Sequence, residues 1–124
     1  MKRIFLPILC LVALALAGCN PEEINEGVDC VDSDVIGLWV LADSQEYWRY
    51  DSGHYGETWD ESDDVHEGEG TKYSWSLEGS ALHIELNGEM GEVVPYDYTI
   101  VAMSETTMKL KEGMFSIEKT YYRQ

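Results

Sequence analysis

The sequence predicts an all-β protein, namely a small up-and-down antiparallel β-barrel of about eight strands. From residue 35 onward, short runs rich in β-branched and aromatic residues recur about every ten residues, separated by Gly, Ser and Asp. In this region, apolar residues nowhere recur with the 3.6-residue spacing of an amphipathic helix. The short connections favour a meander, and eight strands are enough to close a small barrel without free edges.

The first three strands are predicted by their composition and by the turn between the second and the third. Residues 35–43 (VIGLWVLAD) are rich in Val, Leu and Trp, which suit the half-buried surface of a sheet. Two further runs, 46–51 (EYWRYD) and 55–60 (YGETWD), are joined by Ser-Gly-His, a connection short enough for a hairpin. These runs form the start of the meander.

The fourth and fifth strands form the clearest hairpin in the sequence. Residues 70–78 (GTKYSWSLE) and 81–87 (ALHIELN) both alternate between apolar and polar side chains. This period of two is that of a strand with one buried face. The connection between the two arms contains Gly79, which is typical of a tight turn.

The last three strands complete the barrel. Residues 92–103 form the longest run, and Pro95 within it lacks the N–H group that a ladder needs. This predicts an edge, a bulge or a bend at that point. Residues 106–111 and 114–123 follow, separated by Glu-Gly.

The residues that alternate inward are candidates for lining a ligand cavity. A lining of aromatic and aliphatic side chains could accept an apolar or ring-shaped ligand, with tyrosine hydroxyls fixing its orientation. The same side chains could instead pack together as a core, because an eight-stranded barrel is at the size where either outcome is possible. The candidate lining residues are Tyr73, Trp75, Leu77, Leu82, Ile84, Leu86, Tyr96, Tyr98, Ile100, Phe115 and Ile117.

The chain begins with features typical of a secreted protein. A Lys-Arg pair precedes an apolar run over residues 4–15, which is too short to span a bilayer as a mature helix. This start, together with Leu-Ala-Gly-Cys at 16–19, resembles a bacterial lipoprotein signal peptide that ends in a lipobox. The resemblance implies that residues 1–18 are removed and that Cys19 is lipidated.

Residues 19–34 are predicted to form an acidic, flexible tether between the lipid and a barrel domain over 35–124. The segment is polar and poor in core-forming residues. Acyl chains on Cys19 would hold the domain at a membrane, because each buried methylene contributes about 0.8 kcal/mol. The Asn-Pro-Glu-Glu run directly after Cys19 resembles acidic signals that route some Bacteroidetes lipoproteins to the cell surface, which implies the cell envelope and its outer membrane as the location.

The charge balance narrows the classes of partner. Twenty-four Asp and Glu face eight Lys and Arg, and the formal net charge of −16 becomes about −18 once Lys2 and Arg3 are removed. We therefore expect no nucleic-acid partner, since cationic contacts to phosphate dominate that binding. The negative field would steer a cationic protein towards the domain, although solubility alone is a sufficient explanation of the charge.

No catalytic, cofactor or metal motif is present. The acidic segment 60–69 holds six carboxylates but lacks the D-x-D-x-D-G spacing of a calcium loop. The three histidines show neither H-x-H nor H-E-x-x-H spacing, and no nucleophile is paired with a base at a recognisable spacing. The sequence therefore predicts a protein that is not an enzyme and has no cofactor.

Several short motifs resemble those of one family. Gly37-Leu38-Trp39 matches the G-x-W signature that opens lipocalins and their bacterial lipocalin-like relatives, and Tyr-Asp-Ser-Gly at 50–53 is similar to a turn of small Bacteroidetes lipocalin-like lipoproteins. The resemblance covers most of the predicted domain and implies structural roles for Gly37, Trp39 and Arg123. Trp39 would close one end of the barrel, with Arg123 packed across its ring. The T-D-Y motif of larger lipocalins is absent from the expected turn.

Two functions follow from these observations. The first is a lipid-anchored envelope lipoprotein whose lipocalin-like barrel binds a small apolar ligand. The second is an acidic protein-interaction module, or an inhibitor of a cationic protein partner. The interior of the barrel distinguishes them, because an internal void favours the first function and a filled core favours the second.

Overall fold

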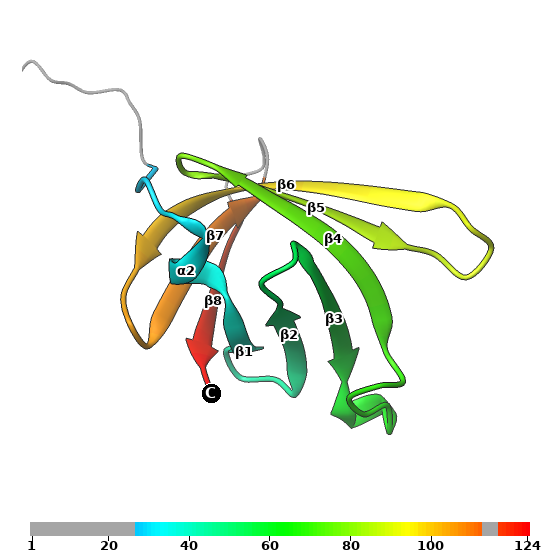
Figure 1. The fold of residues 1–124 in the computed structure, drawn as a ribbon. Helices are drawn as coiled ribbons and strands as arrows, with labels where there is room; N and C mark the ends of the chain where they lie inside the picture. Colours follow the sequence, from blue (N-terminus) through cyan, green and yellow to red (C-terminus); the bar gives the residue numbers. More distant parts are fainter. Residues whose placement is uncertain (1–26, 113–116) are drawn as a thin grey trace, which may run out of the picture.

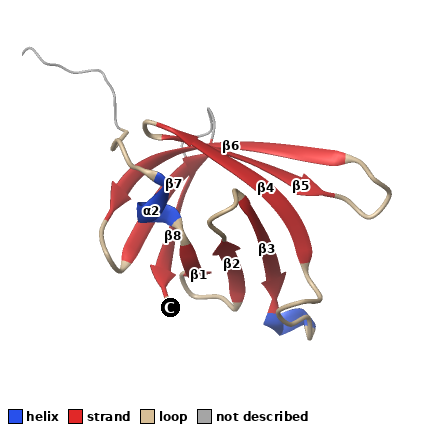
Figure 2. Cartoon of the chain, in the orientation of Figure 1, coloured by secondary structure: helices blue, strands red, loops and turns tan. Residues whose placement is uncertain are grey.

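The computed structural model describes residues 27–112 and 117–124, and this part of the chain is nearly all β-structure (Figure 2). Eight strands form one closed barrel in which each strand pairs antiparallel with the next along the chain, and the last pairs with the first (Figure 1). The predicted fold, an up-and-down eight-stranded barrel, is confirmed. The strands are β1 (Gly37–Leu41), β2 (Glu46–Tyr50), β3 (Tyr55–Asp60), β4 (Thr71–Glu78), β5 (Ala81–Asn87), β6 (Val93–Met103), β7 (Thr107–Glu112) and β8 (Ile117–Arg123).

The alternation seen in the sequence sets the register of the sheet. In the β4–β5 hairpin Trp75 lies opposite Ile84, and both point into the barrel, where they are 3% and 1% exposed. Polar Ser76 lies opposite His83 on the outer face. A slip by one residue would turn every apolar side chain outward, so the buried face specifies this pairing.

One end of the barrel, which we call the closed end, is covered by the helical turn α2 (Asp32–Val35). Val35 is fully buried in the core. The carboxylate of Asp32 lies 2.7 Å from Nε2 of His54, in the turn between β2 and β3. The first strand therefore begins at Gly37, later than the predicted residue 35, because the preceding residues form this cover.

The chain lies against the barrel from Val28 onward, which differs from the flexible tether predicted over residues 19–34. The N–H of Val28 donates to the carbonyl of Ile100 at 2.8 Å, and the N–H of Cys30 donates to the carbonyl of Gly79 at 3.0 Å. The prediction relied on side-chain composition, whereas these contacts use backbone groups that any sequence carries. The earlier part of that tether lies outside the described residues and stays a prediction.

The β5–β6 hairpin projects beyond the other strands at the opposite end of the barrel, which we call the open end (Figure 1). Strand β6 pairs with β5 from its start, but its pairing with β7 begins only at Tyr98. Residues 93–97 are therefore a sheet edge among the described residues, and Pro95 lies on it, where a missing N–H is tolerated. The sequence predicts an edge, a bulge or a bend at Pro95, and the structure shows the edge. The register shift of β6, typical of a bulge, lies further along the strand, between Ile100 and Ala102.

The inside of the barrel is filled by large side chains that interlock as aromatic pairs. The ring of Tyr50 meets those of Tyr73 and Trp75 edge to face, with centroids 5.6 Å apart in both pairs. Such pairs contribute about 0.5–1.5 kcal/mol beyond the area that they bury. The buried core consists of Val35, Trp39, Trp48, Tyr50, Tyr73, Trp75, Leu82, Ile84, Tyr98, Ile100, Met108, Leu110 and Tyr121.

Candidate functional site

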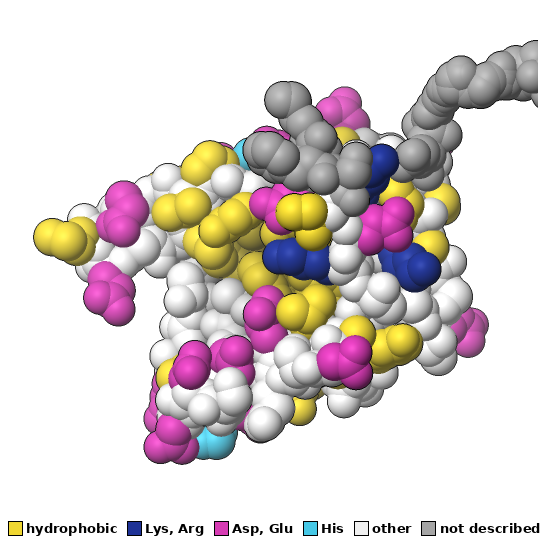
Figure 3. Space-filling view, turned by 180° about the vertical axis from the view of Figure 1, so that it is seen from behind, with side chains coloured by type: hydrophobic (Ala, Val, Ile, Leu, Met, Phe, Trp, Pro, Cys, Tyr) yellow, Lys and Arg dark blue, Asp and Glu magenta, His cyan; other side chains and the backbone are white. Residues whose placement is uncertain are grey.

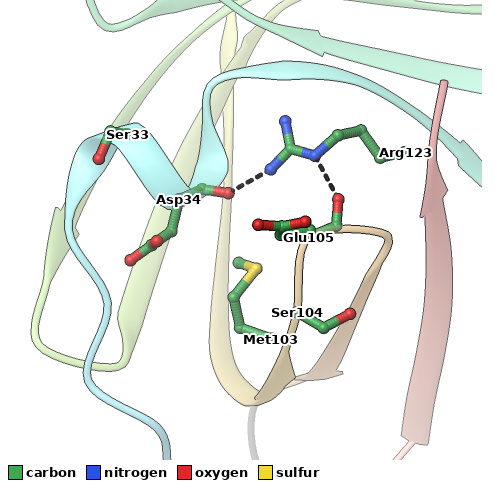
Figure 4. A pocket seen from close by; sticks show the side chains of 6 residues that line it. All are labelled: Ser33, Asp34, Met103, Ser104, Glu105 and Arg123. Carbon is green, nitrogen blue, oxygen red and sulfur yellow. Dashed lines mark hydrogen bonds between the residues drawn. The ribbon is translucent and has the colours of Figure 1, made fainter.

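The closed end is sealed by Arg123, which ends β8. Its guanidinium carbon lies 4.3 Å from the centroid of the Trp39 ring, the pair singled out in the sequence. The same guanidinium donates to the carbonyls of Asp34, Ile36 and Glu105, each at 2.8 Å. Figure 4 shows two of these bonds, in a hollow lined by Ser33, Asp34, Met103, Ser104, Glu105 and Arg123. All the nitrogens of Arg123 are occupied by the fold, so this hollow is a structural feature.

Gly37 makes the approach of Arg123 possible. Its φ angle is 140°, a conformation that side chains rarely adopt. A Cβ atom at this position would lie 2.5 Å from Nη1 of Arg123. The glycine of the G-x-W motif is therefore needed for the contact that closes the barrel.

The predicted lining residues fall into groups with different exposure. Phe115 lies outside the described residues, and Ile117 is 53% exposed on the rim of the open end. Leu77, Leu86 and Tyr96 are half-buried and pack on the core. The residues that belong to the buried core are Tyr73, Trp75, Leu82, Ile84, Tyr98 and Ile100.

Three tyrosines of the core have hydroxyl groups for which the described residues offer no hydrogen-bond partner. These are Tyr50, Tyr98 and Tyr121, which are 2%, 5% and 2% exposed. Tyr73 differs, because its hydroxyl donates to the carbonyl of Arg49 at 2.7 Å. Buried polar groups are almost always hydrogen-bonded in folded proteins, so three exceptions in one barrel mark a polar place within an apolar core.

Two carboxylates lie on the same inward face, nearer the open end. Glu46 begins β2, and its Oε2 accepts the indole N–H of Trp48 at 2.7 Å. Glu112 ends β7 and lies opposite Tyr98 in the sheet register. Nζ of Lys119 is 3.9 Å from Oε1 of Glu112. The polar groups of the barrel thus continue from the tyrosines toward the open end.

The carboxylates are among the causes that raise the pKa values of two of the hydroxyls, those of Tyr98 and Tyr121. Burial raises the pKa of the Tyr121 hydroxyl well above its ordinary value, and Tyr98, Glu46 and Glu112 raise it further. Burial likewise raises the pKa of Tyr98, with Glu112 as the next cause. The hydroxyls therefore stay protonated and can both donate and accept hydrogen bonds.

The rim of the open end is apolar. Val94 lies opposite Leu86 on the projecting hairpin and is 37% exposed. Ile117 lies two strands further along the sheet, on β8, opposite Glu112 of β7. In the view from behind, apolar side chains gather in the recess between the projecting hairpin and the neighbouring strands (Figure 3). We take the candidate site to be this open end, defined by the rim residues Leu86, Val94, Tyr96 and Ile117, the carboxylates of Glu46 and Glu112 with Lys119, and the hydroxyls of Tyr98 and Tyr121.

Sequence reasoning missed the two carboxylates of the site, although a signal was present. Glu46 stands two residues before Trp48, and Glu112 two residues after Leu110, so both share the parity of a buried residue on their strand. Counting by two places them inside the barrel. A charged residue at an inward position near a strand end is thus a signal for a polar group at the mouth of a barrel.

A buried carboxylate lies outside this site, on the outer face of β3. Glu57 is 1% exposed and accepts the N–H groups of Gly68 at 2.9 Å and Gly70 at 2.8 Å. Nη1 of Arg49 is 3.3 Å from it and Nζ of Lys72 is 3.5 Å from it. Burial raises the pKa of this carboxyl, but the two N–H groups and the lysine outweigh burial and hold it below its ordinary value. Glu57 fastens the acidic loop after β3 to the barrel.

The described residues contain neither a cluster placed to hold a metal ion nor a helix able to cross a membrane. Within residues 27–112 and 117–124, no group of three or more His, Cys, Asp or Glu is placed to hold a metal ion. In the acidic segment 60–69, Asp60 instead caps the short helix η2 (Glu61–Asp63) by accepting the N–H of Ser62 at 2.9 Å. In the same described part of the chain, no helix is long and apolar enough to cross a bilayer.

Comparisons with known proteins assign no family to the chain. No protein-family model, no curated protein and no solved structure matches it. The lipocalin resemblance therefore stays a prediction, carried by the short motifs and compatible with the eight-stranded barrel.

Proposed function

We propose that this protein is a lipid-anchored lipoprotein of the bacterial cell envelope whose barrel binds a small, largely apolar ligand at its open end. One observation carries the binding proposal: among the described residues, Val94 and Ile117 are inward-facing apolar side chains that stay exposed, and both lie at this end, above a filled core. Covering a rim residue such as Val94 or Ile117 completely would contribute up to about 1.5–3 kcal/mol. A ligand that covers the rim thus gains hydrophobic free energy that the fold leaves unused.

The filled core limits how a ligand can enter. The closed half is packed by Trp39, Tyr73 and Trp75, which are 0%, 0% and 3% exposed. A ligand therefore reaches only the open half, with one end at the tyrosine hydroxyls and its body against the rim. This favours a small molecule over a long acyl chain, which needs a deep cavity.

The anchoring proposal is independent of the barrel and has its own test. We expect the mature protein to begin at Cys19 and to carry acyl chains, and the Cys19→Ser variant to lose them. Mass spectrometry of the protein extracted from its host's membranes measures both. An unacylated protein that keeps residues 1–18 would contradict this proposal.

The binding proposal is tested with two valines that differ in the face they occupy. Val94 faces the open end, while Val93, next to it, points outward and is 53% exposed. The full chain is reconstituted in nanodiscs, and binding of 2-phenylethanol is measured by calorimetry against empty nanodiscs. We expect Val94→Gln to weaken binding about tenfold, because about 1.4 kcal/mol of apolar contact is lost. Val93→Gln should leave it unchanged, and equal effects would place binding elsewhere.

The alternative function, recognition of a cationic protein, stays a prediction from the net charge. This function predicts that the protein retains a basic protein in a pull-down at low salt and releases it at high salt, because salt screens the attraction between exposed charges.

A further inference from the structure

We propose that the ligand of the open end carries a protonated amine, held by the carboxylate of Glu46 and the hydroxyls of Tyr98 and Tyr121. This inference rests on the proposed binding function and adds the chemical class of the ligand's polar group. It is carried by two independent features of the described residues: buried hydroxyls that have no hydrogen-bond partner among them, and a carboxylate with no cation of this part of the chain beside it.

The first feature is the set of hydroxyls. Leaving a buried polar group unsatisfied costs about 1–3 kcal/mol, so a ligand that satisfies such a group gains free energy. Tyr98 and Tyr121 are inward-facing residues on separate strands, β6 and β8. A protonated amine has three N–H donors, of which these two hydroxyls can accept two and Glu46 the third.

The second feature is the sign of the charge. Glu112 is balanced by Lys119, whose Nζ lies 3.9 Å away. Glu46 accepts the indole N–H of Trp48, and no cationic group among the described residues lies within 4.0 Å of it. The described residues that define the site thus include two carboxylates and one ammonium, which leaves one negative charge for a ligand to neutralise. The net charge of the whole chain, −16, acts in the same direction.

The aromatic rings around these groups also favour a cation. Trp48 is 8% exposed and stands directly beside Glu46. The faces of Trp and Tyr rings attract an ammonium group, by about 0.5 kcal/mol at exposed sites and about 2 kcal/mol when it is desolvated. A carboxylate ligand would meet the opposite conditions, namely two acidic side chains and the negative faces of the rings.

The test uses three ligands that share one apolar body. These are 2-phenylethylamine, 2-phenylethanol and phenylacetate, which are cationic, neutral and anionic at neutral pH and dissolve in water. Binding to the full chain in nanodiscs is measured by calorimetry with empty nanodiscs as the blank. We expect the amine to bind at least about tenfold more tightly than the alcohol, and phenylacetate to bind most weakly, because one charge-assisted hydrogen bond is worth at least that factor.

Two variants locate the effect. Glu46→Gln should reduce the affinity for the amine about tenfold and leave the affinity for the alcohol nearly unchanged, because the variant removes charge and keeps shape. Glu118→Gln is the matched control, since Glu118 is an exposed carboxylate of β8 between the inward-facing Ile117 and Lys119. It should change neither affinity.

The hydroxyls are tested by Tyr121→Phe and Tyr73→Phe. Loss of the Tyr121 hydroxyl should weaken amine binding and leave the unfolding free energy the same or slightly higher, because an unsatisfied group is removed. Loss of the Tyr73 hydroxyl should instead lower the unfolding free energy, since its bond to Arg49 is broken, and leave binding unchanged. A merely structural role for Tyr121 would give the pattern of Tyr73.

The outcomes separate this inference from the function on which it rests. Tightest binding by the amine, lost in Glu46→Gln, supports both. Equal or tighter binding of the alcohol or of phenylacetate, still weakened by Val94→Gln, overturns the amine and leaves the binding site in place. An amine affinity that Tyr121→Phe does not change shows that water alone satisfies that hydroxyl and overturns its role. Absence of binding by all three ligands overturns the proposed function itself.

Discussion

Replacing Arg123 with Ala removes all the contacts that its guanidinium makes at the closed end. The guanidinium stacks on Trp39 and donates to three backbone carbonyls, those of Asp34, Ile36 and Glu105. The change therefore detaches β8 and α2 from each other as well as uncovering the indole. We expect a less stable barrel with an unchanged open end.

The size of the effect follows from these contacts. The cation–π contact contributes about 0.5–2 kcal/mol. Hydrogen bonds to a charged donor are worth about 1.5–3 kcal/mol when buried, but Arg123 is partly exposed and the released carbonyls regain water, so we count about 0.5–1 kcal/mol for each. The expected loss of unfolding free energy is about 2–5 kcal/mol, and the expected fall in Tm is about 10–30 °C, since each kcal/mol lowers Tm by about 4–8 °C in a domain of this size.

Chemical denaturation of the reconstituted chain, followed by tryptophan fluorescence, measures this loss. Lys109→Ala is the matched control, because Lys109 is an exposed cation of β7 and its removal should change the unfolding free energy by less than about 0.5 kcal/mol. Arg123→Lys keeps the charge but not the planar fork of donors, so it should fall between the two.

Two results would refute the reasoning. A loss below about 1 kcal/mol in Arg123→Ala would show that the contacts on Trp39 and the carbonyls contribute little, because the cation–π contact alone accounts for about that much. A change in ligand affinity as large as that of Val94→Gln would show that the two ends of the barrel are not independent.

Two further changes test the closed end and the outer face of the barrel. Gly37→Ala should lower the unfolding free energy by about 1–2 kcal/mol more than Gly91→Ala, because both glycines have positive φ but only at Gly37 would the new Cβ meet Arg123. Equal losses in thermal denaturation would exclude that clash. The folded-state pKa of Glu57 is depressed, so its contribution to stability is present above its unfolded pKa and is lost as the pH falls through its lower folded pKa. Acid unfolding of Glu57→Gln should accordingly show a shallower loss of stability below about pH 4.5, and identical profiles would rule out this linkage.

Local alternation was enough to predict the barrel. Trp75 and Ile84 belong to runs with a period of two, and they meet inside the barrel as that period requires. Gly37, Trp39 and Arg123 were found by a motif, and the motif works because the geometry of one corner needs all three residue types. Where a pattern is local, or where a contact demands unusual chemistry, the sequence carries the information.

Features that depend on distant segments were not predictable in this way. Glu57 looks like an exposed carboxylate of a strand, and only the return of the loop containing Gly68 and Gly70 buries it. The attachment of Val28 and Cys30 to the barrel uses backbone groups, which leave no trace in composition. The hydroxyl of Tyr121 has no hydrogen-bond partner among the described residues, a property that depends on the surrounding strands and that no single segment of the sequence shows.

The attachment of Val28 and Cys30 determines at which end of the barrel the preceding chain joins the domain. The described chain joins the barrel beside the β4–β5 turn, at the pole that α2 covers, while the rim around Val94 lies at the far pole. A lipid on Cys19 would therefore hold the domain by its sealed base and leave its mouth pointing away from the bilayer. Molecules arriving from the surrounding solution would meet the entrance first, without having to pass between the protein and the membrane.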